Sequence, residues 1–407
     1  SVYETLKSNP PFCRYLVRLV SNSEYLTEIL IRDPGLFDVF ASRTVFDRAP
    51  SKEELRAQLD LLRSAYEAAA GPYRFRDEQV LRVGMRELFA GAGIVEIGQE
   101  LTRVAEVLLE YAIDQAQAEV VQRYGPASGP FAILALGKFG GKEMGYGSDL
   151  DLTFVYGSEA TIESGMAPSE YYAAVASRVI QCLKGHTRYG TLYDIDARLR
   201  PDGKKGVLAV SGRRFSEYYL GEAQAWERLA LIKARAVAGD LEFGKEVETE
   251  ARDIAFSLPL TPETLAGIGE IRRKIVHGAS PKDLKKAEGG LTDIEFIVRL
   301  LQLRHAGQWP DLKRGDVLGA LDALGRHQLL PEAHSRGLHD AYVLLRRVEN
   351  RIRMKHGRSE SMLPDTPEEL DDLSRRLEMP DVAERVRQAR QAVRAAYDDA
   401  SCLIRWP

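Results

Sequence analysis

One segment near the middle of the sequence constrains the fold more than any other. Residues 136–147 contain five glycines, and Ser-Asp-Leu-Asp-Leu-Thr-Phe-Val-Tyr follows at 148–156. Side chains alternate between the two faces of a β-strand. One face of a strand from residue 149 would therefore carry only core-forming side chains, Leu150, Leu152, Phe154 and Tyr156. Asp149 and Asp151 would share the other face, about 7 Å apart. This pattern predicts a β-strand.

Residues 192–200 repeat the arrangement. One predicted face is apolar and carries Tyr193, Ile195, Ala197 and Leu199. The other face carries two aspartates and two arginines, Asp194, Asp196, Arg198 and Arg200. Guanidinium groups match the geometry of phosphate oxygens, so this strand offers phosphate partners together with further carboxylates.

The polar faces of these strands predict a binding chemistry. Neighbouring carboxylates raise each other's pKa unless a cation lies between them, and carboxylate oxygens suit Mg²⁺. The glycines let backbone N–H groups approach a polyphosphate, and Ser148 adds a hydroxyl. An Asp-x-Asp pair alone is usually a solvated strand face, and a lone glycine cluster is a weak signal. Together, the loop and both acidic strands predict metal-dependent nucleotide chemistry.

The sequence on both sides of the strands has a helical pattern. Ser51-Lys-Glu-Glu54 is a capping box, and apolar residues recur at helical spacing over 93–123. The other predicted elements are strands at 131–136 and 207–211, a helix near 169–184, and helices from about 221 onward, including one over 226–235. The predicted fold class is α+β, a small mixed sheet in a mostly helical chain. The predicted domains are 1–125 (helical), 126–235 (sheet-containing) and 236–407 (helical bundle).

Charge and cysteine content disfavour several classes of protein. The 407 residues include 56 Lys and Arg against 60 Asp and Glu, a net charge of −4, which disfavours a protein that coats nucleic acid. Three scattered cysteines disfavour a disulfide framework or a structural zinc site. No apolar run approaches the roughly 18 residues of a membrane span. We therefore expect a cytoplasmic protein, and the missing initiator Met suggests a chain cut from a longer one.

The order of the motifs resembles a known superfamily. Gly137 followed by Asp149-x-Asp151, with Asp196 on a later strand, is similar to the DNA polymerase β-type nucleotidyltransferases. Lys138 departs from that pattern, because the superfamily usually has Gly-Gly or Gly-Ser after the first strand. The narrower combination of Gly-Lys-x-Gly-Gly-x-Glu with Gly-Ser-Asp-Leu-Asp-Leu resembles the bacterial glutamine-synthetase adenylyltransferases.

Three further segments agree with this family, namely 196–201, 226–235 and 289–296. Its members carry an adenylyl-removing half followed by an adenylyl-adding half. Gly-Tyr-Gly-Ser-Asp-Leu-Asp at 145–151 and Gly-Leu-Thr-Asp-Ile-Glu at 290–295 are more similar to the adding half. The basic segment at 345–351 suits either half.

The resemblance implies transfer of AMP from ATP to a tyrosine of glutamine synthetase, with pyrophosphate as the leaving group. It implies two Mg²⁺ held by Asp149, Asp151 and Asp196, with Asp196 as the general base. The implied nucleotide-binding residues are Gly137, Lys138, Gly147, Ser148, Arg198, Arg200 and Lys233. The implied partners are glutamine synthetase and the signal protein PII, and the sheet would be of nucleotidyltransferase type.

Other interpretations stay open at this point. The same carboxylates would serve the removing reaction, in which phosphate releases ADP from modified glutamine synthetase. A catalytically idle PII-binding module is a further alternative, against which the intact carboxylates argue. An RNA nucleotidyltransferase is disfavoured by the acidic net charge.

Several residues near the motifs are interpreted as structural. Asp194 is expected to be a bystander, and Trp226 is expected to lie in the core. Residues 292–295 predict a capping box, and 346–353 predict a solvated or partner-facing basic helix.

Overall fold

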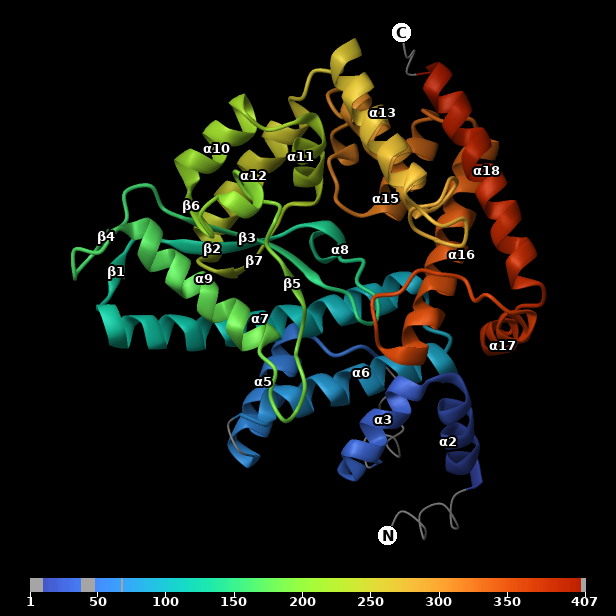
Figure 1. Ribbon diagram of the computed structural model, residues 1–407, viewed down its shortest axis with the longest axis horizontal. Helices are drawn as coiled ribbons and strands as arrows, with labels where there is room; N and C mark the ends of the chain where they lie inside the picture. Colours follow the sequence, from blue (N-terminus) through green and yellow to red (C-terminus); the bar gives the residue numbers. More distant parts are fainter. Residues whose placement is uncertain (1–9, 38–47, 67–68, 404–407) are drawn as a thin grey trace.

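The computed structural model describes residues 10–37, 48–66 and 69–403. A small sheet lies between helices from the early and middle parts of the chain, and the last helices, drawn in orange and red, lie to one side of it (Figure 1). The first group of helices comprises α2 (Pro10–Asn22), α3 (Glu24–Arg32), α5 (Lys52–Ala65), α6 (Gly71–Phe89) and α7 (Ile94–Tyr124). The Ser51 side chain accepts from Glu54 N at 3.2 Å, and the Glu54 carboxylate accepts from Ser51 N at 2.7 Å, which confirms the predicted capping box at α5.

The sheet is mixed, as predicted. Its strands are β2 (Phe131–Ala135), β3 (Leu150–Tyr156), β5 (Ile195–Asp196), β6 (Ala209–Ser211) and β7 (Arg235–Gly239). The order is β5-β3-β2-β7, with β6 also paired to β3. β2 pairs antiparallel with both β3 and β7, whereas β5 and β6 run parallel to β3. A separate two-stranded ribbon joins β1 (Ala127–Ser128) to β4 (Thr161–Ile162).

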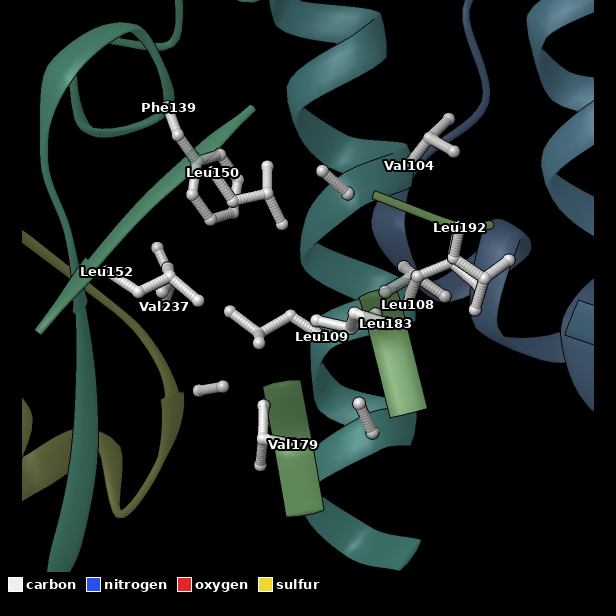
Figure 2. Close-up of a cluster of buried hydrophobic side chains, with 14 of the residues drawn as sticks. Val104, Leu108, Leu109, Phe139, Leu150, Leu152, Val179, Leu183, Leu192 and Val237 are labelled. Atoms are coloured by element: carbon white, nitrogen blue, oxygen red, sulfur yellow. The ribbon is translucent and has the colours of Figure 1, made fainter. Parts of the chain in front are cut away.

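Both faces of the sheet are buried, each in its own hydrophobic core. One core contains the predicted apolar face of β3, Leu150, Leu152, Phe154 and Tyr156, packed against α7 and α9 (Pro168–Lys184). Figure 2 shows Leu109 of α7 pointing toward the strand that carries Leu150 and Leu152, whereas Leu108 lies beside Leu192. The other core contains Leu134 and Val155 together with the later helices. Because both faces of the sheet are covered, the polar residues Asp149 and Asp151 lie at the end where β3 begins.

The later helices are α10 (Gly212–Gly221), α11 (Ala225–Ala230), α12 (Leu241–Phe256), α13 (Pro262–His277), α14 (Leu291–His305), α15 (Val317–Arg326), α16 (Glu332–His356), α17 (Pro367–Leu377) and α18 (Val382–Leu403). α16 reaches both cores, because Met354 lies in the first core and Leu345 in the second. It ends at Gly357, whose φ of +67° is the left-handed conformation that terminates many helices. No helix of the described residues is long and apolar enough to cross a membrane.

Two elements differ from the sequence prediction. The predicted strand at 192–200 forms a ladder only at Ile195–Asp196, because Arg200 turns back onto the carbonyls of Gly206 and Val207. The predicted helix over 226–235 ends at Ala230, and Arg235–Gly239 forms a strand against β2. The small residues of β7 form a strand because their backbone pairs with the buried strand β2. The local sequence pattern does not reveal this pairing.

Three residue-level expectations were also wrong. Trp226 is 37% exposed rather than in the core. The helix predicted to be capped by Thr292 begins instead at Leu291, with Gly290 as N-cap and no side-chain cap. The basic stretch at 346–353 is not solvated, since Arg346 and Arg353 are buried. The domain boundaries at 125/126 and 235/236 stay a prediction.

Candidate functional site

Parallel pairing of β3 with β5 brings the predicted aspartates together. Asp151 lies directly opposite Asp196 in this register, and Leu150 N donates to the Asp194 carbonyl at 2.9 Å. One carboxylate oxygen from each of Asp149, Asp151 and Asp196 lies within 4.8 Å of the other two. Asp149 is exposed at the beginning of β3, whereas the other two are half-buried. Two segments separated by over forty residues thus form one acidic cluster.

Glycine at position 137 is required by this cluster. Gly137 follows β2 after one intervening residue and has a φ of +54°, which favours glycine. A Cβ at this position would overlap the Asp151 carboxylate. The glycine loop, defined here as residues 137–148, therefore begins in direct contact with the acidic cluster.

The cluster is electrostatically strained. Burial raises the pKa of Asp151 to about 7, and the negative charges of Asp149 and Asp196 add to this effect. The pKa of Asp196 moves the other way, because the Arg198 guanidinium donates hydrogen bonds to its carboxylate. Three convergent carboxylates, one of them resisting ionisation, are a donor set that fits a hard divalent cation.

Arg198 and Arg200 make different contacts, although the sequence predicts them on one strand face. The 64% exposed side chain of Arg198 pairs with Asp196. Arg200 donates to the carbonyls of Ala197, Gly206 and Val207, so it closes its own loop. Of these two arginines, Arg198 alone makes an ion pair with the acidic cluster. Asp194, the expected bystander, is exposed and pairs with Lys184 at 3.7 Å.

Lys138 and Lys233 are engaged in buried ion pairs. The Lys138 ammonium lies 3.1 Å from Oε1 of Glu349 in α16, and the Glu349 side chain is fully buried. The Lys233 ammonium lies 2.8 Å from Oε2 of Glu143, and its side chain is only 4% exposed. Both lysines thus connect the glycine loop to other parts of the chain.

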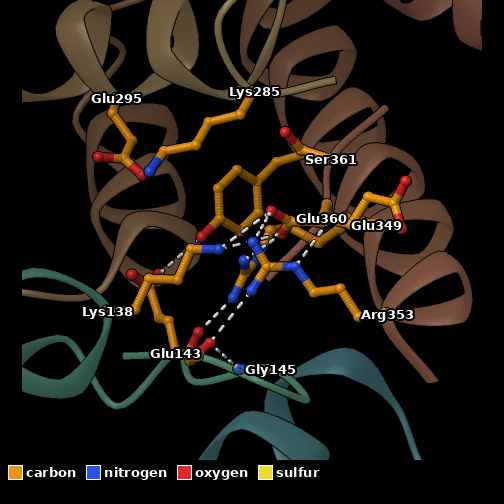
Figure 3. A network of polar contacts seen from close by, with 12 residues as sticks. Lys138, Glu143, Gly145, Lys285, Glu295, Glu349, Arg353, Glu360 and Ser361 are labelled. Atoms are coloured by element: carbon orange, nitrogen blue, oxygen red, sulfur yellow. Dashed lines mark hydrogen bonds and ion pairs between the residues drawn. The ribbon is translucent and has the colours of Figure 1, made fainter. Parts of the chain in front are cut away.

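Helix α16 holds the glycine loop through a network of charged side chains (Figure 3). Arg346 and Arg353 donate to opposite oxygens of Glu349 at 2.6 and 2.8 Å. Arg346 also donates to the Glu143 carbonyl, and Arg353 donates to Ser148 Oγ at 3.3 Å. Cations surround Glu349, so its pKa is held well below the usual range although burial opposes this. The basic segment predicted to be solvated is therefore buried against the loop.

Sequence reasoning missed Glu143, Glu349 and Arg353. A signal was available in α16, because Arg346, Glu349 and Arg353 are spaced by three and four residues, the spacing of ion pairs along one helix face. That spacing does not reveal which distant loop the face would contact.

Gly147 and Ser148 lie between the acidic cluster and α16. Gly147 has a φ of +60°, and a Cβ there would lie 2.8 Å from the Arg358 backbone. Ser148 Oγ accepts from Gly145 N at 3.0 Å, which closes the end of the loop. A cavity of about 380 Å³ adjoins this point and is lined in part by Arg76, Asp194 and Arg358.

Comparison with known proteins places these features in a family. The family model described as glutamate-ammonia ligase adenylyltransferase matches residues 13–250, and the model described as GlnD PII-uridylyltransferase matches residues 270–400. The bifunctional glutamine synthetase adenylyltransferase/adenylyl-removing enzymes of Brucella suis biovar 1 (strain 1330) and Brucella melitensis biotype 1 are each 33% identical over 316 residues. The match covers 74% of this chain and 32% of each relative, so the chain spans about a third of their length. Because the first model covers more than half of the chain, the chain belongs to the glutamate-ammonia ligase adenylyltransferase family.

Proposed function

We propose that this chain transfers AMP from ATP to a tyrosine hydroxyl of glutamine synthetase and releases pyrophosphate. The observation that carries the proposal is the cluster of Asp149, Asp151 and Asp196 beside the glycine loop, in a member of an adenylyltransferase family. Glutamine synthetase is named in the description of the similar Brucella enzymes.

The three carboxylates are proposed to hold Mg²⁺. Burial raises the pKa of Asp151, and the charges of Asp149 and Asp196 raise it further. This supports the role, since a bound cation would relieve the repulsion among the three carboxylates. The family resemblance implies two Mg²⁺ ions. They would neutralise charge on the phosphates and increase the acidity of the acceptor hydroxyl.

The chain's own residues then serve an in-line displacement. The tyrosine oxygen bonds to the α-phosphorus as the bond to the β-phosphate oxygen breaks, and pyrophosphate departs. Asp196 is proposed to accept the tyrosine proton, as the resemblance implies. The Arg198 hydrogen bonds lower the pKa of Asp196, which keeps its carboxylate ionised but also makes it a weaker base. Arg198 orients that carboxylate through its hydrogen bonds. Gly147 and Ser148 are proposed to bind phosphate, while Gly137 gives the Asp151 carboxylate its space.

Lys138, Arg200 and Lys233 are proposed to act on the nucleotide indirectly. Each is engaged with a carboxylate or with backbone carbonyls, and each fixes a segment that borders the acidic cluster. In this role they keep the loop in the conformation that receives the phosphates.

The decisive experiment measures the adenylyl-adding and the adenylyl-removing reactions separately. The chain is incubated with labelled ATP and unmodified glutamine synthetase, and separately with AMP-modified synthetase and phosphate. The proposal expects label on the synthetase in the first arm, and loss of that label in an Asp149→Asn variant that retains the wild-type circular dichroism spectrum. Activity in the second arm alone would assign the chain to the removing reaction.

A regulatory role involving PII is the second candidate. It is favoured by the match of residues 270–400 to a PII-uridylyltransferase model. If the chain were an idle PII-binding module, calorimetric titration with Mg-ATP would give no binding, whereas titration with PII would. Binding of both would make PII a partner of an active enzyme.

A further inference from the structure

A further cavity, of about 750 Å³, lies against the middle of the glycine loop. Residues 140–143 of the loop form part of its wall, and the rest comes from α7, β7, α12, α16 and the segment around Gly315. The aspartates of the acidic cluster do not line it. Cavities of this size hold small organic ligands. It is therefore a candidate binding site separate from the acidic cluster.

Positive charge exceeds negative charge in the wall of this cavity. Seven lysines and arginines line it, against three carboxylates. Four of these cations already form ion pairs, namely Arg235, Lys313, Arg314 and Arg346. Lys245 and Arg252 share one carboxylate, that of Glu248, at 2.7 and 3.1 Å. The seventh cation, Lys142, and one charge of the Lys245–Arg252 pair are therefore left without an acidic partner in the described part of the chain.

The α12 side of the cavity holds an arginine with an unused donor. Glu248 is buried, and its Oε2 accepts from Ala236 N at 2.9 Å, so its carboxylate is fixed against β7. Its Oε1 faces both Lys245 and Arg252. Arg252 Nε is buried and has no hydrogen-bond partner among the described residues. An anion in the cavity would supply that partner and compensate the excess charge.

Lys142 lines the loop side of the cavity. Its side chain is exposed, and among the described residues only its backbone groups are hydrogen-bonded. Its φ of +58° is the left-handed conformation, which favours glycine, and Gly140 and Gly141 precede it. A lysine in this conformation costs free energy that a third glycine would avoid, and such positions cluster at ligand-binding sites. The lysine side chain therefore has a use that its backbone position does not explain.

The same cavity has an apolar side. Val95 and Leu241 line it and are 48% and 50% exposed, whereas the large apolar side chains of both cores are buried. Leu318 adds a half-buried apolar side chain to the wall. Apolar residues beside cations without acidic partners fit a ligand that has an apolar body and an anionic group.

The wall of the cavity also supports the glycine loop. Glu143 Oε1 accepts from Val317 N at 2.7 Å and from Tyr342 Oη at 3.1 Å. Arg235 Nε donates to the Gly140 carbonyl at 3.1 Å. These residues all line the cavity or adjoin its wall. A ligand in contact with them would restrain the loop, whose two ends border the acidic cluster.

We propose that this cavity binds a small organic anion and that the bound anion restrains the glycine loop. The negative groups of the ligand contact Lys142 and the Lys245–Arg252 pair, and its apolar body lies against Val95 and Leu241. This inference goes beyond the proposed AMP transfer and does not depend on it. Lysine and arginine bind phosphate and carboxylate alike, so the probes must distinguish these two anionic groups.

The test compares two fluorescent probes that differ by one charge, anilinonaphthalene sulfonate and the uncharged phenylnaphthylamine. Titration of the full chain should show saturable binding of the sulfonate and weaker binding of the uncharged probe. Naphthyl phosphate or naphthoate should displace the sulfonate, and the more effective competitor identifies the anionic group that the cavity prefers. An affinity for the uncharged probe that equals that for the sulfonate, or displacement by neither competitor, would overturn the proposal.

Variants test whether the probe occupies this cavity. Lys142→Gly and Arg252→Met should each weaken sulfonate binding about three- to tenfold and leave the uncharged probe unaffected. Lys142→Gly should be at least as stable in urea as the wild type, because glycine adopts this φ without strain, so weaker binding would not reflect unfolding. Lys286→Met is the matched control, since Lys286 is exposed and lies outside the cavity wall. Unchanged sulfonate binding in both Lys142→Gly and Arg252→Met would contradict the proposed site.

A third measurement addresses the glycine loop. Amide hydrogen exchange in residues 137–148 should slow when the sulfonate saturates the wild type, whereas exchange in α17 should not change. Unchanged exchange in the loop would overturn the proposed restraint. Asp149→Asn should bind the sulfonate as tightly as the wild type, because Asp149 does not line the cavity. Loss of binding in that variant would place the probe at the acidic cluster instead.

Discussion

At the scale of single residues, the site is a compromise between stability and binding. Asp151 is half-buried, faces two further carboxylates and lies against Gly137. Such a residue destabilises the fold when it is ionised, unless a cation compensates it. Residues kept despite this cost are found at functional sites.

The first prediction concerns Asp151 and pH. Its carboxyl has an ordinary pKa of 3.8 and a folded pKa of about 7, raised first by burial. The folded state therefore holds the proton more tightly, and the stability this contributes below pH 4 is lost as pH rises to about 7. Without divalent cations, Asp151→Asn should melt about 2 °C or more above the wild type at pH 8, with a smaller difference at pH 5.

The control is Asp149→Asn, which removes an exposed carboxylate and should change the melting temperature less. Added Mg²⁺ should stabilise the wild type but not Asp151→Asn. Equal pH profiles for wild type and Asp151→Asn in calorimetry would contradict the prediction.

The second prediction concerns Gly137. Alanine here would have both an unfavourable φ and a Cβ overlapping the Asp151 carboxylate. Gly137→Ala should lower AMP transfer at least about tenfold, because displacement of a metal-binding or positioning group by about 1 Å has effects of that size. Gly165→Ala is the matched control, since Gly165 has a φ of +77° but open space around it. Equal activities of the two variants would show that the overlap has no consequence.

At the scale of elements, α16 connects the glycine loop to the helical part of the chain. Three cations, Lys138, Arg346 and Arg353, converge on Glu349. Removing the anion leaves these buried charges without their common partner, which is more destabilising than the pairs are stabilising.

Glu349→Gln should therefore lower the free energy of unfolding by about 3 kcal/mol or more. Glu332→Gln on the same helix is the control, because Glu332 is 85% exposed and its pairing with Arg336 should contribute less than about 1 kcal/mol. Urea denaturation of both variants measures the difference. Similar midpoints for the two would mean that the network does not stabilise the loop.

The local sequence pattern was sufficient to predict strand β3 but not strand β7. The alternation in 149–156 predicted β3 and its buried face, because a strand that faces a core must alternate regardless of its partners. β7 was predicted as helix, since Arg-Ala-Val-Ala-Gly has no strong period of either kind. The ladder to β2 decided its structure, and β2 lies about 100 residues earlier.

At the scale of the whole molecule, the two cores are connected. α16 contributes Met354 to the core that contains α7, and Leu345 to the core formed with the later helices. Ser23 Oγ donates to the Met354 carbonyl at 2.5 Å, which ties α3 to the same helix.

The described chain should therefore unfold as one cooperative unit. Differential scanning calorimetry should give a single transition, with a van't Hoff enthalpy equal to the calorimetric enthalpy. Glu349→Gln should lower the temperature of that one transition. Two separate peaks would instead show that the helical segments fold independently of each other.

The sequence by itself predicted the acidic cluster that the structure brings together. Strand alternation predicted that Asp149 and Asp151 share a face, because alternation is a local property that neighbouring residues encode, whereas the family resemblance selected Asp196 over Asp194. The tertiary structure alone decided which cations remain available to a ligand. Lys138 pairs with Glu349 across 211 positions of sequence, and Lys233 pairs with Glu143 across 90. Such pairings depend on how distant segments pack, because the charge of a side chain does not specify its partner.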